Sequence, residues 1–300
     1  MTCATNYLLM GNACVPCPGG ANLGSVLGVF AGVCVVLFFT VLLVVLKIKT
    51  HTEDNDVATL KDHIAGQASI LISWAQIVSA VTVTFNSVSW PTNFSTASQT
   101  VGVVNLDLSF LLPHASCRMS LPFGLKLCIH VATPVACALA TKLATFVAIK
   151  LSKKISRASM DAKHHKGHNI LLTLLLLLYP SLTTKLFTSL RCFNVEGVGE
   201  MLERDFSIEC WKEEHTVYVT IAVVGMVVYA FGIPMYLLFD LWKHRAHLHD
   251  KDSPKYHQIR FKMGAFFKDY EEEYWYFEVI IMFQKMLMAG ALSVIAPRSP

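Results

Sequence analysis

Two long apolar runs constrain the fold of this chain more than any other feature. Residues 170–190 and 216–242 each contain about 20 or more mostly apolar residues, the length at which a helix crosses a bilayer. A polar segment bracketed by Cys192 and Cys210 separates the two runs. The pattern therefore predicts a transmembrane helical hairpin whose connecting loop is held by cysteines.

Further apolar stretches extend this pattern over most of the chain. Of the 300 residues, 54% are hydrophobic and only 15% are charged, which lies outside the range of soluble domains. We predict an all-α polytopic membrane protein with six transmembrane helices, an extracellular N-terminus and short outer loops that carry disulfides. The expected helices span residues 23–46, 64–90, 121–151, 169–190, 216–242 and 274–296.

The segments around these helices give more specific expectations. Pro180 and Pro234 lie inside helices, so each helix should kink and its freed carbonyl should find a partner on a neighbouring helix. The basic, histidine-containing residues 153–168 are interpreted as a solvated loop, with a metal site as the weaker alternative. The charged and aromatic residues 243–273 predict an amphipathic helix at the membrane surface.

The cysteines at the N-terminus suggest a second region. Residues 1–20 contain Cys3, Cys14 and Cys17, and no second ligand pair at zinc-site spacing follows the Cys-x-x-Cys. We interpret these residues as the end of an extracellular disulfide-rich module, and residues 21–300 as a transmembrane domain truncated at its C-terminus. Three cysteines cannot all pair with one another, so further sequence is expected upstream.

The distribution of basic residues predicts the orientation. Most of the 25 lysine and arginine residues fall in the three connections assigned to the cytoplasm, which places the N-terminus on the extracellular or lumenal side. Asn93, in an Asn-Phe-Ser glycosylation sequon, falls on that outer side, as do Cys117, Cys192 and Cys210. Membrane orientation explains the net charge of +4 better than nucleic-acid binding does. The expected location is the plasma membrane or an endomembrane.

Candidate functional residues are ionisable side chains at membrane depth, because no enzyme motif and no cofactor-binding motif is found. Charged groups there are costly and therefore functional candidates, although pairing with a neighbouring helix or snorkelling to the headgroups is the competing interpretation. The candidates are Glu278, Lys285, Lys142 and Lys185. Residues 216–241 contain no lysine or arginine, which argues against voltage sensing by that helix.

The outer cysteines have two open pairings. A disulfide between Cys192 and Cys210 across the outer loop is favoured, and Cys117 bonded to one of them is the alternative.

Several motifs taken together resemble one family. The first is Cys14-x-x-Cys17-Pro-Gly, which is similar to the last turn of ephrin-receptor-like cysteine-rich repeats. The others are WAQ at 74–76, WP at 90–91, NLD at 105–107 followed by Cys117, YPSLTTKLF at 179–187, DFSIECW at 205–211 followed by His215, YAFGIP at 229–234, and YWYFE at 274–278 followed by Lys285. Over nearly its whole length the chain resembles the transient-receptor-potential-like C-terminal membrane domain that such repeats precede in large proteins of protists and algae.

The resemblance implies a cation channel subunit, or a fragment of one, with an extracellular cysteine-rich sensor region. Helix two would be the first helix of a six-helix channel unit, and helix six the first pore helix, with the selectivity filter beyond Pro300. The implied partners are lipid, cations, an extracellular ligand and further copies of the chain. The alternative is a heptahelical-type receptor or adhesion protein lacking its last helix. A Cys117 bond to the outer hairpin loop would favour the receptor, whereas a Cys192–Cys210 bond would favour the channel-like family. A transporter is a weaker third reading, because no inverted repeat is found.

Overall fold

The computed structural model of the protein is mostly helical. It describes residues 7–10, 13–16, 23–46, 55–84, 90–101, 123–152, 157–195, 197, 199–203, 205–250 and 252–291.

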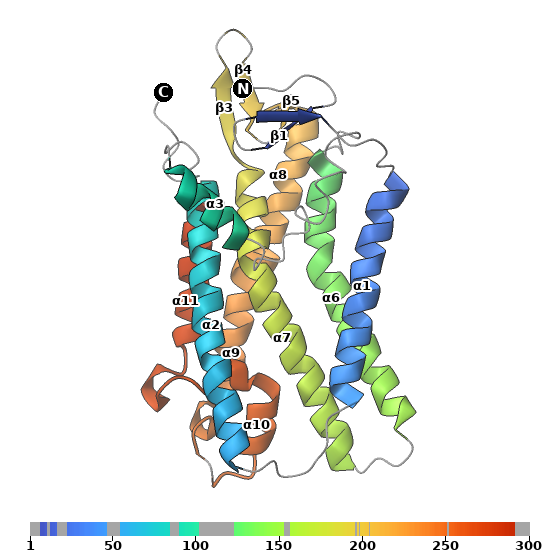
Figure 1. The fold of residues 1–300 in the computed structure, drawn as a ribbon, viewed down its shortest axis with the longest axis vertical. Helices are drawn as coiled ribbons and strands as arrows, with labels where there is room; N and C mark the ends of the chain where they lie inside the picture. Colours follow the sequence, from blue (N-terminus) through green and yellow to red (C-terminus); the bar gives the residue numbers. More distant parts are fainter. Residues whose placement is uncertain are drawn as a thin grey trace.

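Long helices lie side by side and run between the two ends of the molecule (Figure 1). They are α1 (Leu23–Leu46), α2 (Asn55–Thr84), α6 (Phe123–Leu151) and α7 (Arg157–Thr188). A continuous helical run follows, made of α8 (Glu213–Gly225), the π-helix η2 (Met226–Phe231) and α9 (Gly232–His244). The last helix, α11 (Phe277–Met286), continues into a second π-helix, η6 (Leu287–Ala291). α1 packs on α6, whereas η6 packs on α2 and α7.

Three described helices are long and apolar enough to cross a membrane, namely Phe123–Leu151, Ser159–Thr188 and Glu213–His247. Shorter apolar stretches occur at Phe30–Leu46 and Gln67–Val81. Large apolar side chains such as Val36, Phe39 and Leu139 are exposed on the sides of these helices. These helices are the features expected of a membrane protein, while the full set of six spans remains a prediction.

The observed helix boundaries agree with expectation for α1 and differ at the starts of α2, which begins at Asn55 and not at 64, and of α7. The predicted helix 169–190 begins at Arg157 instead, so residues 157–168 are helical and the expectation of a loop there is wrong. Helix can extend past the apolar run because no proline interrupts this basic stretch. Lys163 is buried, and its ammonium donates to Ser152 Oγ at the end of α6. Packing against α6 therefore orders a segment that composition marks as solvated.

Two small antiparallel sheets depart from the all-α expectation. β1 (Tyr7–Met10) pairs with β2 (Ala13–Pro16). The predicted outer loop forms a three-stranded sheet of β3 (Cys192–Val195), β4 (Gly199–Leu202) and β5 (Asp205–Glu209) in the order β3-β4-β5. Gly197 and Gly199, with φ of 80° and 111°, adopt the positive φ that the tight turn between β3 and β4 requires.

The segment after α9 is folded onto the bundle and is not one amphipathic helix. It contains η3 (Arg245–His247), α10 (Tyr256–Met263), η4 (Gly264–Phe266) and η5 (Glu272–Tyr274), and α10 packs on α7. Phe266 and Phe267 are buried in the main apolar core with residues of α7, α9 and α11. Phe266 and Phe267 therefore stabilise the protein interior and not a contact with the membrane surface, whereas Phe261 is exposed.

A buried tyrosine compensates for the proline inside the fifth predicted helix. Pro234 lacks the N–H that would bond the carbonyl of Ala230 in an α-helix. The hydroxyl of Tyr179, fully buried in α7, donates to that carbonyl at 2.7 Å. The prediction that a neighbouring helix would satisfy the freed carbonyl is confirmed for Pro234, and the π-helical turn η2 directly precedes this site.

The two ends of the bundle differ in content. The β3–β5 sheet and the short helix α3 (Thr92–Val101) lie at one end, and α10 lies at the other (Figure 1). α3 is attached to α2, where Ser98 Oγ donates to the carbonyl of Val78 at 3.3 Å. Asn93 is exposed on α3, so the sequon and the β3–β5 sheet occupy the same end of the bundle (Figure 1). Its glycosylation stays a prediction.

Candidate functional site

A buried lysine joins three helices. Lys285, on α11, has only 2% of its surface exposed. Its ammonium donates to Gln76 Oε1 at 2.9 Å and to Ser73 Oγ at 3.1 Å, both on α2. The amide of Gln76, which is 1% exposed, donates in turn to the carbonyl of Leu177 on α7 at 3.0 Å. A cation buried among neutral acceptors depends on every one of them, so this contact couples α2, α7 and α11.

A second buried ionisable group, Glu278, lies in the first turn of α11. Glu278 is 4% exposed, and its Oε2 accepts a hydrogen bond from the hydroxyl of Tyr270 at 2.7 Å. Burial, together with the nearby Glu278 carboxylate, raises the pKa of Tyr270 above its ordinary value. The hydroxyl therefore keeps its proton at neutral pH. Glu278 Oε1 is buried and has no hydrogen-bond partner among the described residues.

Glu278 and Lys285 thus lie on the interior face of α11, as their spacing predicts, but they serve different contacts. The lysine binds α2, and the glutamate binds the segment that precedes α11. Among the described residues no ion pair joins them directly.

The segment between α9 and α11 is held to the bundle by further polar contacts. Lys262 Nζ lies 2.6 Å from Oδ2 of the buried Asp240 on α9. Asn169, on α7, donates to the carbonyl of Phe261 at 3.0 Å. His249 Nε2 lies 3.0 Å from the carbonyl of Tyr270, the residue that also holds Glu278. We call the contacts made by Asp240, Asn169 and Tyr270 the linker contacts. They connect α7, α9 and α11 through the intervening segment.

The other two intramembrane candidates lie elsewhere. Lys142 lines a cavity between α6 and α7, away from α11. Lys185 is half-buried near the outer end of α7, where its carbonyl accepts from Ser189 Oγ at 2.8 Å. The structure therefore places Glu278 and Lys285 on one helix face and separates them from Lys142 and Lys185.

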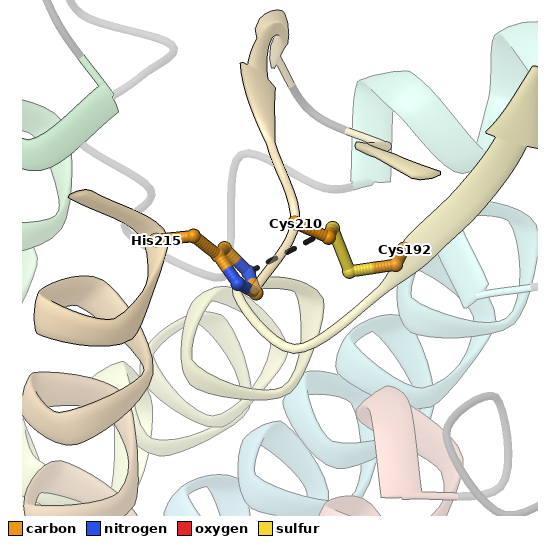
Figure 2. A group of neighbouring side chains, drawn as sticks. All are labelled: Cys192, Cys210 and His215. Atoms are coloured by element: carbon orange, nitrogen blue, oxygen red, sulfur yellow. Dashed lines mark hydrogen bonds between the residues drawn. A yellow bond between two sulfur atoms is a disulfide. The ribbon is translucent and has the colours of Figure 1, made fainter. Parts of the chain in front are cut away.

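The outer hairpin is closed by the favoured disulfide. Cys192 and Cys210 are bonded, which confirms that prediction and leaves neither of them for Cys117 (Figure 2). Cys3, Cys17 and Cys117 fall outside the described residues. Cys14 falls in β2, and its pairing stays a prediction.

A strained tryptophan and a buried histidine adjoin this disulfide. Trp211 has φ of 67°, a left-handed conformation that is rare for a bulky residue. Its N–H donates to His215 Nδ1 at 3.1 Å, and its indole N–H donates to Glu200 Oε2 at 2.7 Å. The side chain itself stays 68% exposed. These bonds hold an exposed indole in a fixed orientation beside the outer sheet, and strain of this kind is often retained at recognition sites.

Cys192, Cys210 and His215 lie close together but do not form a metal site. The ligand atoms of Cys192, Cys210 and His215 lie within 4.8 Å of one another. Both sulfurs, however, are in the disulfide, and His215 Nδ1 already accepts a hydrogen bond from Trp211. His215 Nε2 must then carry the proton, and it points toward Cys210 Sγ at 4.0 Å (Figure 2). Metal ions bind cysteine as the thiolate, which a disulfide does not offer, and the imidazole lone pair is already used by Trp211, so we assign a structural role to this group.

Sequence reasoning identified the charged members of the buried contacts but not their partners. Ser73 and Tyr270 were missed as partners of Lys285 and Glu278. Gln76 was included only as part of the WAQ motif at 74–76. The spacing of Ser73 and Gln76, three residues apart, places them on one helix face and is the signal that could have found them.

Comparison with known proteins adds no assignment: no family model matches the chain, and no curated protein or solved structure matches it.

Proposed function

We propose that the chain is a transient-receptor-potential-like cation channel subunit, or part of one, that spans the membrane several times. The observation that carries the proposal is the Cys192–Cys210 disulfide. It closes the loop between α7 and α8 on itself, which is the pairing that the channel-like family implies. A bond from Cys117 to one of these cysteines would favour the competing heptahelical receptor, but Cys192 and Cys210 are bonded to each other.

The linker contacts support the same proposal. In a channel unit, a segment between the fourth and fifth helices transmits movement of the helical bundle to the pore helix. We assign that place to α10 and the residues around it. Asp240 and Asn169 hold them to α9 and α7, and Tyr270 holds them to α11. Movement at the inner ends of α7 or α9 would therefore be passed to α11.

The buried Lys285 supplies a second connection in the proposed mechanism. It joins α11 to α2 within the bundle and limits how far these helices can separate. We propose that Lys285 sets the balance between open and closed states and that it does not line the pore. The proposed orientation places the β3–β5 sheet outside the cell and α10 in the cytoplasm.

Recording from cells that express the full-length protein tests the proposal. We expect a cation current in response to stretch, cytosolic calcium or applied ligands, and a changed open probability for Lys285→Met. The matched control is Lys150→Gln, which removes an exposed lysine from the end of α6. Absence of current under all three stimuli, with the protein verified at the cell surface by biotinylation, would count decisively against a channel.

A further inference from the structure

A cavity of about 470 Å³ lies between α6, α7 and α10. Its volume is in the range of pockets that hold a small molecule or a cofactor. Lys142 of α6 and Lys262 of α10 contribute to the wall, and α7 contributes three histidines, His164, His165 and His168. The buried contacts of α11 do not involve this cavity.

The ionisable groups of the lining are all basic, whereas most of the surface that the lining exposes is apolar. Apart from the two lysines and three histidines, the lining residues are threonines, a glycine and a leucine. The hydroxyls of Thr141 and Thr145 donate to carbonyls of their own helix, so they leave recognition to the basic groups. Lysine ammoniums offer only donors, and each imidazole offers one N–H donor when neutral and two when protonated. The lining therefore suits an anion with several acceptor oxygens.

Several of these basic groups have no partner in the part of the chain that the structure describes. The side chains of Lys142, His164 and His165 form no hydrogen bond or ion pair there. Lys262 directs one N–H to Asp240, which leaves two others. His168 Nε2 lies 3.2 Å from the hydroxyl of Tyr236, and its Nδ1 is buried without a partner. Lys142 and His164 are exposed and free to reach an anion, whereas a buried polar atom such as His168 Nδ1 normally binds water or a ligand.

Close helix packing holds the walls in place. A side chain at Gly167 would overlap Thr145 Oγ1, so α6 and α7 approach each other here as closely as a glycine permits. Across the cavity, Asn169 bonds the carbonyl of Phe261 next to Lys262. The basic groups are therefore carried by elements fixed relative to one another, which reduces the free energy needed to organise them around a ligand.

We propose that this cavity binds the phosphate-bearing headgroup of an anionic phospholipid from the cytoplasmic leaflet. The choice of leaflet depends on the proposed function, since it uses the orientation that places α10 in the cytoplasm. Phosphate oxygens bind lysine and histidine donors strongly. Anionic lipids are concentrated in that leaflet, and basic pockets between helices bind their headgroups.

Purified full-length protein in phosphatidylcholine nanodiscs provides the test, with dioctanoyl phosphatidic acid as the probe and thermal stability and Kd as readouts. We expect saturable binding that raises Tm. Lys142→Gln should weaken Kd about fivefold, the factor that corresponds to one lysine near a lipid phosphate. The Lys142→Gln and His164→Gln double variant should weaken Kd further. Lys150→Gln, on the same helix but outside the cavity, should leave Kd within about twofold, since a remote exposed charge contributes little.

Three outcomes would overturn the proposal. Equal weakening by Lys142→Gln and Lys150→Gln would show attraction to general surface charge. An equal Tm increase from inorganic phosphate would identify a soluble anion in place of a lipid, and one from dioctanoyl phosphatidylcholine would remove the requirement for negative charge. Because these readouts need no current, failure to conduct ions would leave this result standing.

Discussion

At the scale of single residues, Tyr270 decides whether the buried carboxylate of Glu278 is satisfied. Tyr270→Phe removes the donor to Oε2 and keeps the ring, so neither carboxylate oxygen keeps a hydrogen bond to the described residues. We expect a loss of about 1–3 kcal/mol in the free energy of unfolding, the usual range for an unsatisfied buried group. Thermal unfolding in nanodiscs measures it, with the exposed Tyr274→Phe as the control. A Tm equal to that of the control would contradict the assigned role.

The same tyrosine predicts a pH dependence. Its pKa is higher in the folded protein than in the unfolded chain, so the folded state binds the phenolic proton more tightly. The resulting stabilisation is complete below the unfolded pKa of about 10 and is lost as the pH rises beyond it. The stability difference between wild type and Tyr270→Phe should therefore be constant from pH 7 to 9 and shrink above pH 10. A difference that grows with alkaline pH would have the wrong sign.

Lys285 and Gln76 should act as one unit. Gln76→Leu removes the closer acceptor of the ammonium, and Lys285→Met removes the cation itself. Each single change should cost about 1–3 kcal/mol. The double variant should cost less than the sum, because a leucine facing a methionine leaves no charge unpaired. Additive losses would indicate that the two side chains do not interact.

At the scale of elements, the outer hairpin depends on its disulfide. The bond joins residues 18 apart, for which loop closure predicts about 3 kcal/mol of stabilisation. The double variant Cys192→Ala, Cys210→Ala should lose this stabilisation, which would lower Tm, and proteolysis of the β3–β5 sheet should increase. Cys34→Ala, which removes a free cysteine of α1, is the control. Unchanged proteolysis would mean that the sheet is held by its other contacts, such as the 2.8 Å pair of Arg191 and Glu203.

Helix boundaries could be predicted from the sequence where hydropathy sets them, but not where tertiary packing does. Hydropathy located α1 correctly, because both ends of that helix coincide with the ends of an apolar run. It placed the start of α7 too late, since the burial of Lys163 against Ser152 depends on packing that hydropathy does not record. The candidate site divides in the same way. Charges inside apolar runs revealed Glu278 and Lys285, but the Lys285–Gln76 contact joins residues 209 positions apart and requires the tertiary fold.

At the scale of the whole molecule, the two ends of the bundle should lie on opposite sides of the membrane. Ala97 is exposed on α3 at the end that carries the outer sheet, and Ala246 is exposed in η3, beyond α9 toward the other end. In intact cells an impermeant maleimide should label Ala97→Cys, whereas Ala246→Cys should react only after permeabilisation. Labelling of both without permeabilisation would contradict the proposed orientation and the leaflet assigned to the basic cavity.

The hydrogen bond from the Tyr179 hydroxyl to the carbonyl of Ala230 has an evolutionary consequence. A phenylalanine at 179 is tolerable only where the backbone at 234 supplies its own N–H, so the tyrosine and the proline should be gained and lost together. Related sequences with a residue other than proline at 234 are expected to vary at 179. Related sequences that keep the proline are expected to keep the tyrosine. Sequencing of diverged copies would reveal that covariation, or its absence.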